Sequence, residues 1–225
     1  MTVRRAIVLA DGGAPTRAQL DLAWPGWDAD IAFVVAADGG ARLADALELR
    51  IDRWVGDGDS LGPEGLDELR RRGIDVGLEP VAKDTSDAEL ALLAAIDSGA
   101  EAVVILGALR GPRLDHELAN VALLGHPSAA GRELSILDPT ARIRLLAGPD
   151  ARLELPGRIG DLVSLIPLEA TSGVVTTGLE FPLARETLPF GPARGISNVR
   201  VVERAAVALE RGRLLVVEVP ATLAP

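Results

Sequence analysis

Up to about residue 138, short apolar runs alternate with segments of helical periodicity, and this alternation restricts the fold more than any other feature of the chain. We expect buried strands at residues 6–10, 31–36, 53–56, 102–106 and 134–137. We expect helices between them, at residues 15–23, 41–49, 63–72, 87–96 and 114–124. Strands that alternate with helices predict a parallel sheet that is covered on both faces.

After about residue 140 the helical pattern stops. Short strand-like runs follow, broken by Gly and Pro, at residues 141–146, 151–155, 162–167, 173–177, 199–202, 207–209 and 214–219. Successive strands without helices between them predict an antiparallel β-sandwich or barrel. Residues 188–198 are rich in Gly and Pro, and we expect a long loop there. The predicted fold class is therefore α/β, with a parallel-sheet domain over residues 1–140 and an antiparallel β-sandwich domain over residues 141–225.

Two carboxylates, Asp57 and Asp59, lie two positions apart between glycines, directly after the apolar run at 53–56. In an extended segment, residues i and i+2 point to the same side. Two such charges about 5 Å apart repel by roughly 3 kcal/mol at an effective dielectric constant of about 20. The pair is tolerated if one carboxylate is protonated, if both are solvated, or if a cation lies between them.

Further acidic motifs lie at the starts of expected helices, at residues 83–87 and 113–116. In an open parallel sheet, ligands bind beyond the carboxyl ends of the strands. Asp38, Asp57 and Asp59 all follow expected strands at that edge. The sequence therefore predicts an acidic site there.

The turn that contains Asp38 has a near copy earlier in the chain. Both Asp11-Gly-Gly-Ala14 and Asp38-Gly-Gly-Ala41 stand between an expected strand and an expected helix. An internal duplication or shared turn chemistry explains the likeness, because glycine frees the backbone where the chain reverses.

Composition removes several kinds of site. The chain has no cysteine and two histidines, which excludes disulfides, thiolate nucleophiles and Cys- or His-rich metal sites. The net charge of -10 argues against a nucleic-acid partner. No apolar run is long enough to span a membrane, and the first one ends at Asp11, too early for a signal peptide. We therefore expect a cytoplasmic protein without a membrane partner, whose reactive groups are carboxylates and a hard cation.

Lys83 is the single lysine among 23 basic residues. Either a compact ammonium is kept where a guanidinium does not fit, or chance placed the last lysine in this acidic motif. A P-loop is excluded, because no Gly-Lys-Ser/Thr sequence occurs.

Taken in order, these motifs make the sequence resemble the thiamine pyrophosphokinase family. The resemblance runs through Ala37-Asp-Gly-Gly-Ala41, Val55-Gly-Asp-Gly-Asp-Ser60, Lys83-Asp-Thr-Ser-Asp87, Gly107-Ala108, Arg113-Leu-Asp-His116, Asn120, Thr177-Gly-Leu-Glu-Phe-Pro-Leu183 and Ser197-Asn198. The fold that it implies, an α/β domain followed by a β-sandwich, agrees with the strand and helix patterns.

The resemblance implies that a pyrophosphoryl group moves from ATP to the hydroxyethyl group of thiamine, which yields thiamine diphosphate and AMP. It also implies Mg²⁺ as cofactor and a homodimer in which the second domain of one chain helps to build the site of the other. Two alternatives remain open. One is a pyrophosphokinase of the same fold that acts on another alcohol, such as a pterin. The other is a non-catalytic sensor of a nucleotide or of thiamine diphosphate.

The resemblance also implies roles for individual residues. The expected catalytic group is Asp57, Asp59, Lys83, Asp84 and Asp87, of which Asp57, Asp59 and Asp87 are the expected Mg²⁺ ligands. The residues expected at ATP are Asp38, Ser60, Arg113 and His116. Those expected at thiamine are Asp115, Phe181, Ser197 and Asn198.

Two of these assignments have structural alternatives. His116 and Asn120 are four residues apart on one helix face, and the alternative for them is a packing pair without chemistry. Phe181 offers an aromatic face to the thiamine cation, but a single phenylalanine in a β-domain also suits a core position.

Overall fold

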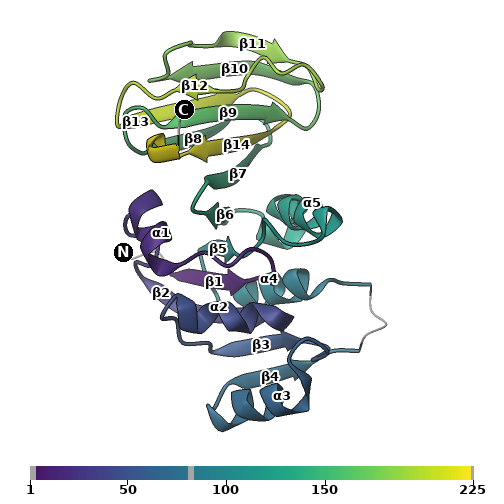
Figure 1. Cartoon of the computed structure of the whole chain (residues 1–225). Helices are drawn as coiled ribbons and strands as arrows, with labels where there is room; N and C mark the ends of the chain where they lie inside the picture. Colours follow the sequence, from purple (N-terminus) through teal and green to yellow (C-terminus); the bar gives the residue numbers. More distant parts are fainter. Residues whose placement is uncertain (1–3, 81–83, 224–225) are drawn as a thin grey trace. The chain divides into compact units, whose positions relative to one another are not determined.

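The computed structural model describes residues 4–80 and 84–223, and the chain divides into two compact units between Pro139 and Thr140. The first unit is an α/β fold, and the second contains two antiparallel sheets (Figure 1). Within the described ranges, no helix is long and apolar enough to cross a membrane.

The first unit is built on a parallel sheet, as the alternating pattern predicts. Its strands are β1 (Arg5–Leu9), β2 (Ile31–Ala37), β3 (Arg53–Gly56), β4 (Asp75–Leu78), β5 (Ala102–Leu106) and β6 (Glu133–Asp138). They lie in the order β6-β5-β1-β2-β3-β4, and neighbouring strands are parallel. Strands β2, β3 and β4 follow one another on one side of β1, and β5 and β6 lie on its other side. The strand order therefore reverses between β1 and β5, where open α/β sheets bind their ligands.

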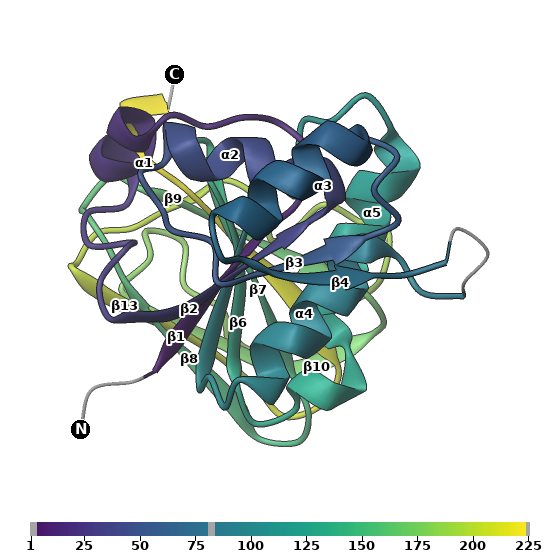
Figure 2. The same ribbon diagram turned by 90° about the horizontal axis from the view of Figure 1, so that it is seen from below.

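Helices cover both faces of this sheet. They are α1 (Arg17–Ala23), α2 (Ala41–Ala46), α3 (Gly62–Arg71), α4 (Asp87–Asp97) and α5 (Leu114–Ala122). Seen from below, α1, α2 and α3 lie over one face and α4 and α5 over the other (Figure 2). One apolar core joins the sheet to the helices of the first face, with Leu9, Trp54, Leu20 and Leu43 among its buried members.

Two of the departures from the predicted helix bounds, at the start of α1 and at the end of α2, have local reasons. The first begins at Arg17 because Thr16 forms a capping box with Gln19, in which each side chain accepts the backbone amide of the other residue. The second ends at Ala46, three residues early, and Glu48 then takes a left-handed backbone angle of φ 55°. Such a residue terminates a helix.

The second unit is a β-sandwich, as predicted. Its strands are β7 (Ala141–Ala147), β8 (Ala151–Pro156), β9 (Leu162–Pro167), β10 (Thr171–Thr177), β11 (Ala184–Leu188), β12 (Asn198–Val199), β13 (Arg204–Leu209) and β14 (Arg213–Val219). Their order is β12-β9-β14-β7 in one sheet and β11-β10-β13-β8 in the other, with antiparallel neighbours. Leucine and valine side chains from both sheets form a single core.

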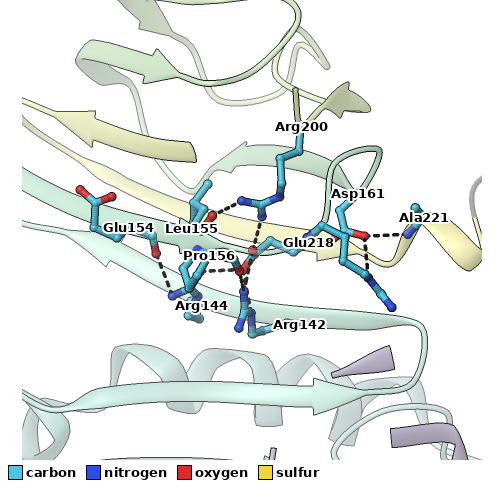
Figure 3. Close-up of polar contacts among 10 residues, drawn as sticks. Arg142, Arg144, Glu154, Leu155, Pro156, Asp161, Arg200, Glu218 and Ala221 are labelled. Carbon is cyan, nitrogen blue, oxygen red and sulfur yellow. Dashed lines mark hydrogen bonds and ion pairs between the residues drawn. The ribbon is translucent and has the colours of Figure 1, made fainter. Parts of the chain in front are cut away.

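A buried carboxylate, Glu218 on β14, lies among three arginines (Figure 3). Arg142 and Arg144 on β7 and Arg200 after β12 each donate to it within 2.8 Å. Burial alone would raise the pKa of Glu218, but the hydrogen bonds and charges of Arg142 and Arg144 outweigh it and lower that pKa. Arg200 is fully buried and also donates to the carbonyl of Leu155 on β8. The cluster therefore ties the segment after β12 to both sheets.

Candidate functional site

Three carboxylates meet at the carboxyl edge of the parallel sheet. Asp38 follows β2, and Asp57 and Asp59 follow the neighbouring strand β3. Each residue offers one carboxylate oxygen, and these oxygens all lie within 4.8 Å of one another. The predicted gathering of acidic residues at this edge is therefore present for Asp38, Asp57 and Asp59, which we call the acidic group.

Ser60 connects two members of the acidic group. Its hydroxyl donates a hydrogen bond to Asp38 Oδ2 and lies 3.2 Å from Asp59 Oδ1. The backbone amide of Asp59 donates to Asp57 Oδ1 at 3.0 Å, which holds the turn after β3. Asp38 itself has a left-handed backbone with φ 44°, and its carbonyl accepts a hydrogen bond of 2.8 Å from the buried indole of Trp54. The positions of the carboxylates are thus set by the folded backbone.

One carboxylate oxygen of Asp38 has no hydrogen-bond partner among residues 4–80 and 84–223. Within the part of the chain that the structure describes, Oδ1 is buried and accepts no hydrogen bond. A buried oxygen in that state is costly unless another group binds it. Carboxylate oxygens are the ligands that Mg²⁺ takes, usually a few at a time together with waters and substrate phosphates. The donor set therefore fits a hard divalent cation.

Asp11 and Arg42 extend this edge of the site, and neither was predicted as a site residue. Asp11 follows β1 and approaches the turn after β2 so closely that a Cβ on Gly39 would lie 2.3 Å from its Oδ2. Burial raises the pKa of Asp11 and the charge of Asp38 adds to the rise, whereas Arg42 opposes it. Arg42 lies 3.8 Å from Asp11 and also donates to the carbonyl of Ser60. The repeated Asp-Gly-Gly-Ala turn was the signal for Asp11.

The second acidic motif contributes to the start of α4. Ser86 caps this helix by accepting the amide of Glu89 at 3.2 Å, and Asp87 is its first residue. Asp87 is not part of the acidic group, and Asp84 is exposed. Lys83 lies outside the described residues.

Arg113 and Asp115 pair with each other at the start of α5. Arg113 Nε donates to Asp115 Oδ1 at 3.1 Å, and a second guanidinium nitrogen donates to Oδ2. This hydrogen bonding lowers the pKa of Asp115 and raises the pKa of Arg113. Both side chains are exposed, as is the neighbouring His116. Arg113, expected at ATP, and Asp115, expected at thiamine, therefore pair with each other.

Asn120 has a structural role. Its side-chain amide donates to the carbonyl of Ala108 at 2.9 Å, so it ties α5 to the loop after β5. Asn120 thus anchors a loop near the end of α5, and His116 is exposed in the first turn of the same helix.

The second unit contains a cavity of about 280 Å³ beside Phe181. Its lining includes Phe181, Asn198, Leu165, Arg194 and Ile196. Phe181 is 64% exposed, so the core-packing alternative for this ring does not hold. Two of the residues expected at thiamine, Phe181 and Asn198, therefore line one hollow.

Ser197 does not line this cavity, although it immediately precedes Asn198. It has a left-handed backbone with φ 57°, and its amide donates to Ser164 Oγ at 3.0 Å. Asp115, the fourth residue expected at thiamine, belongs to the first unit, where it pairs with Arg113.

Two protein-family models match the chain. "Thiamin pyrophosphokinase, catalytic domain" matches residues 27–136, and "Thiamin pyrophosphokinase, vitamin B1 binding domain" matches residues 151–214. The two models describe one family, follow one another in this order and together match well over half of the chain. A search of curated proteins found no match.

Solved structures resemble the whole chain. Thiamin pyrophosphokinase from Geobacillus thermodenitrificans has 26% identity and a TM-score of 0.80, over 99% of this chain and 100% of that one. A thiamin pyrophosphokinase family protein from Enterococcus faecalis has 25% identity and a TM-score of 0.79, over 96% and 98%. Thiamine pyrophosphokinase from Bacillus subtilis has 22% identity and a TM-score of 0.81, over 96% and 99%.

Proposed function

This chain belongs to the thiamin pyrophosphokinase family, and from that premise we propose its reaction: transfer of the pyrophosphoryl group of ATP to the hydroxyl of thiamine, with AMP and thiamine diphosphate as products. Attack at a phosphorus that carries negative oxygens needs alignment and charge neutralisation more than covalent help. The observation that carries the proposal is the acidic group, in which a buried oxygen of Asp38 has no hydrogen-bond partner among the described residues.

We propose that Asp38, Asp57 and Asp59 hold Mg²⁺, with Asp87 as a further ligand and Asp84 nearby. When bound, such a cation neutralises charge on phosphate oxygens and orients them. Ser60 supports this role, because its hydrogen bond to Asp38 Oδ2 leaves Oδ1 as the oxygen available to a ligand. Lys83 is a further proposed contact to a phosphate oxygen, and only its place in the acidic motif at residues 83–87 supports this role.

Arg113 is the proposed cation at the phosphates on the side of α5, and His116 is proposed to lie at ATP with it. The Arg113–Asp115 pair is exposed, and exposed ion pairs stabilise a protein very little. A phosphate therefore competes readily for the guanidinium, and the planar fork of arginine suits bidentate contact with it. Asp115 is then released to accept a hydrogen bond from the amine of the acceptor.

For thiamine, we propose that the cavity beside Phe181 receives the aromatic cation, with the exposed ring as a stacking face. Ser197 remains a proposed polar contact. The proposal includes the homodimer that the sequence resemblance implies, which light scattering would test, and a cytoplasmic location, where ATP is available.

The deciding experiment measures AMP and the pyrophosphorylated product by chromatography, with ATP and Mg²⁺ and one acceptor at a time. We expect AMP and thiamine diphosphate in equal amounts when thiamine is present and almost no AMP without an acceptor. Product formed from a pterin alcohol but not from thiamine would overturn the acceptor assignment. Binding of nucleotide without AMP formation under any of these conditions would make the protein a sensor.

A further inference from the structure

We propose that Asn198 is a positioning residue, which holds Phe181 at the cavity through its backbone and does not itself bind the acceptor. The inference deepens the proposed function and rests on it, since it concerns the same acceptor cavity. It revises the expectation from sequence that Asn198 contacts thiamine directly.

The side chain of Asn198 forms two opposed hydrogen bonds with the backbone of Phe181. Asn198 Oδ1 accepts from the Phe181 amide at 3.0 Å, and Asn198 Nδ2 donates to the Phe181 carbonyl at 2.7 Å. This arrangement copies the paired hydrogen bonds that two residues exchange in an antiparallel sheet. Phe181 lies outside the strands, so a side chain supplies here what a neighbouring strand would supply in a ladder.

These contacts use most of the hydrogen-bonding capacity of Asn198. Its Oδ1 also accepts the amide of Val199 at 2.9 Å, so both acceptor positions are filled. One of the two amide hydrogens is donated to Phe181, which leaves a single N–H. A direct contact with a substrate through Oδ1 would therefore require a bond to the backbone to break.

The segment that carries Asn198 is anchored to the buried interior of the second unit. Arg200, two residues after Asn198, is fully buried and bound to Glu218, and its amide donates to the carbonyl of Asp161 at 2.9 Å. Between them, the carbonyl of Val199 accepts the amide of Glu180 at 2.9 Å. The backbone of residues 198–200 thus connects Phe181 to the buried ionic cluster around Glu218. The side chain of Asn198 makes the contact with Phe181 at one end of this segment, and Arg200 binds Glu218 at the other. A precisely held ring needs such support to act on a ligand.

A double-mutant cycle separates positioning from direct contact. The four proteins are the wild type, Asn198→Ala, Phe181→Ala and the double variant, each assayed for the KM of thiamine and of ATP. We expect Asn198→Ala to raise the KM of thiamine by about tenfold, comparable with loss of the ring contact itself, and to leave the KM of ATP unchanged. In the Phe181→Ala background the same change should have almost no further effect, because there is no ring left to position.

Amide hydrogen exchange supplies a readout that does not depend on activity. Asn198→Ala should accelerate exchange at the Phe181 amide. The neighbouring Glu180 amide should keep its wild-type rate, because a backbone carbonyl accepts its hydrogen bond. If the alanine variant does not fold, Asn198→Asp replaces it in the double-mutant cycle of KM values, since it keeps both acceptor bonds and loses the donor to the Phe181 carbonyl.

Additive effects in the cycle would show that Asn198 contacts the acceptor directly and would overturn the inference. An unchanged KM of thiamine in Asn198→Ala, or unchanged exchange at Phe181, would overturn it as well. Failure of the proposed function is distinguishable, because wild-type protein would then form no thiamine-dependent AMP while the exchange experiment still decides whether Asn198 holds Phe181.

Discussion

Ser60 donates its hydroxyl hydrogen bond to one carboxylate oxygen of Asp38, and the other oxygen of the same carboxylate is buried without a partner among the described residues. The two oxygens of Asp38 thus differ in their surroundings. The hydrogen bond to Oδ2 fixes the orientation of the carboxylate, and this orientation sets the direction in which Oδ1 points. A carboxylate on the surface would have neither the hydrogen bond from Ser60 nor the buried oxygen. We therefore regard Asp38 as the centre of the acidic group.

Asp38→Asn should abolish most of the stabilisation that Mg²⁺ gives to the folded protein. A ligand that binds only the native state raises the melting temperature by mass action, and an amide is a poorer ligand than a carboxylate. Thermal unfolding with and without Mg²⁺ measures the effect. Asp67→Asn is the control, because Asp67 is an exposed carboxylate on α3 that pairs with Arg70. An equal Mg²⁺ response in Asp38→Asn and wild type would remove Asp38 from the metal site.

Asp59→Asn should fold normally and lose about a thousandfold in pyrophosphoryl transfer, the order expected when a preorganised charge interaction is lost. Without metal it should be at least as stable as wild type, because one of three neighbouring negative charges is gone. Steady-state AMP formation and chemical denaturation check the two parts. Near-normal turnover at limiting Mg²⁺ would contradict the assignment.

Phe181→Ala should cost little stability, within about 0.5 kcal/mol, because the ring is exposed. The KM of thiamine should nevertheless rise by roughly tenfold, which corresponds to about 1.4 kcal/mol of cation–π and apolar contact. Urea denaturation and initial rates measure these quantities. A loss of several kcal/mol in unfolding free energy would instead indicate that the ring supports the fold.

Glu218→Gln should destabilise the protein by about 3–5 kcal/mol, because it leaves three buried or half-buried arginines without their counter-charge. The loss of stability in Glu218→Gln, relative to wild type, should depend on pH. Since the folded protein lowers the pKa of Glu218, its stabilising contribution is present above the ordinary glutamate value of about 4.3 and is lost as pH falls through the folded pKa. The stability gap between wild type and variant should therefore narrow below about pH 4, as urea denaturation at several pH values would show. A gap that widens on acidification would refute the assignment.

Arg113→Gln should raise the pKa of Asp115 toward its ordinary value, because the hydrogen bond from Arg113 is the main cause of the lowering. NMR titration of the Asp115 carboxyl measures this directly. If Arg113 also binds phosphates, the same variant should increase the KM of ATP by about tenfold or more. An unchanged KM would leave the Arg113–Asp115 pair as a surface feature.

Much of the fold was predictable because its signals are local. Buried parallel strands such as β1 and β5 are continuous apolar runs, and their predicted bounds differ from the observed ones by at most one residue. Two strands were not predicted. β4, with the sequence Asp-Val-Gly-Leu, is short, contains glycine and lies at the sheet edge. β11 lies at the edge of its sheet and has mostly exposed, polar residues. Backbone pairing defines both strands, and periodicity does not show it.

The acidic site was predictable only in outline. The motif at 55–60 indicated two carboxylates on one side, but the approach of Asp38 depends on pairing between β2 and β3 and on a left-handed residue at the end of β2. Asp11 lies beside Asp38 because β1 pairs with β2. That pairing is a property of the whole sheet, and no local sequence pattern shows it. The contact between Asn198 and Phe181 joins residues 17 positions apart, and neither periodicity nor a local motif reports it.

The hydrogen bond from Trp54 to the carbonyl of Asp38 gives the protein an optical reporter of its own. The chain has three tryptophans and no tyrosine, and Trp24, Trp27 and Trp54 all lie in the first unit, where they are buried. Intrinsic fluorescence therefore records the first unit alone, and of the three indoles only that of Trp54 donates to a residue of the acidic group. A change of emission on titration with Mg²⁺ would therefore report on the first unit, and we expect Trp54→Phe to remove it.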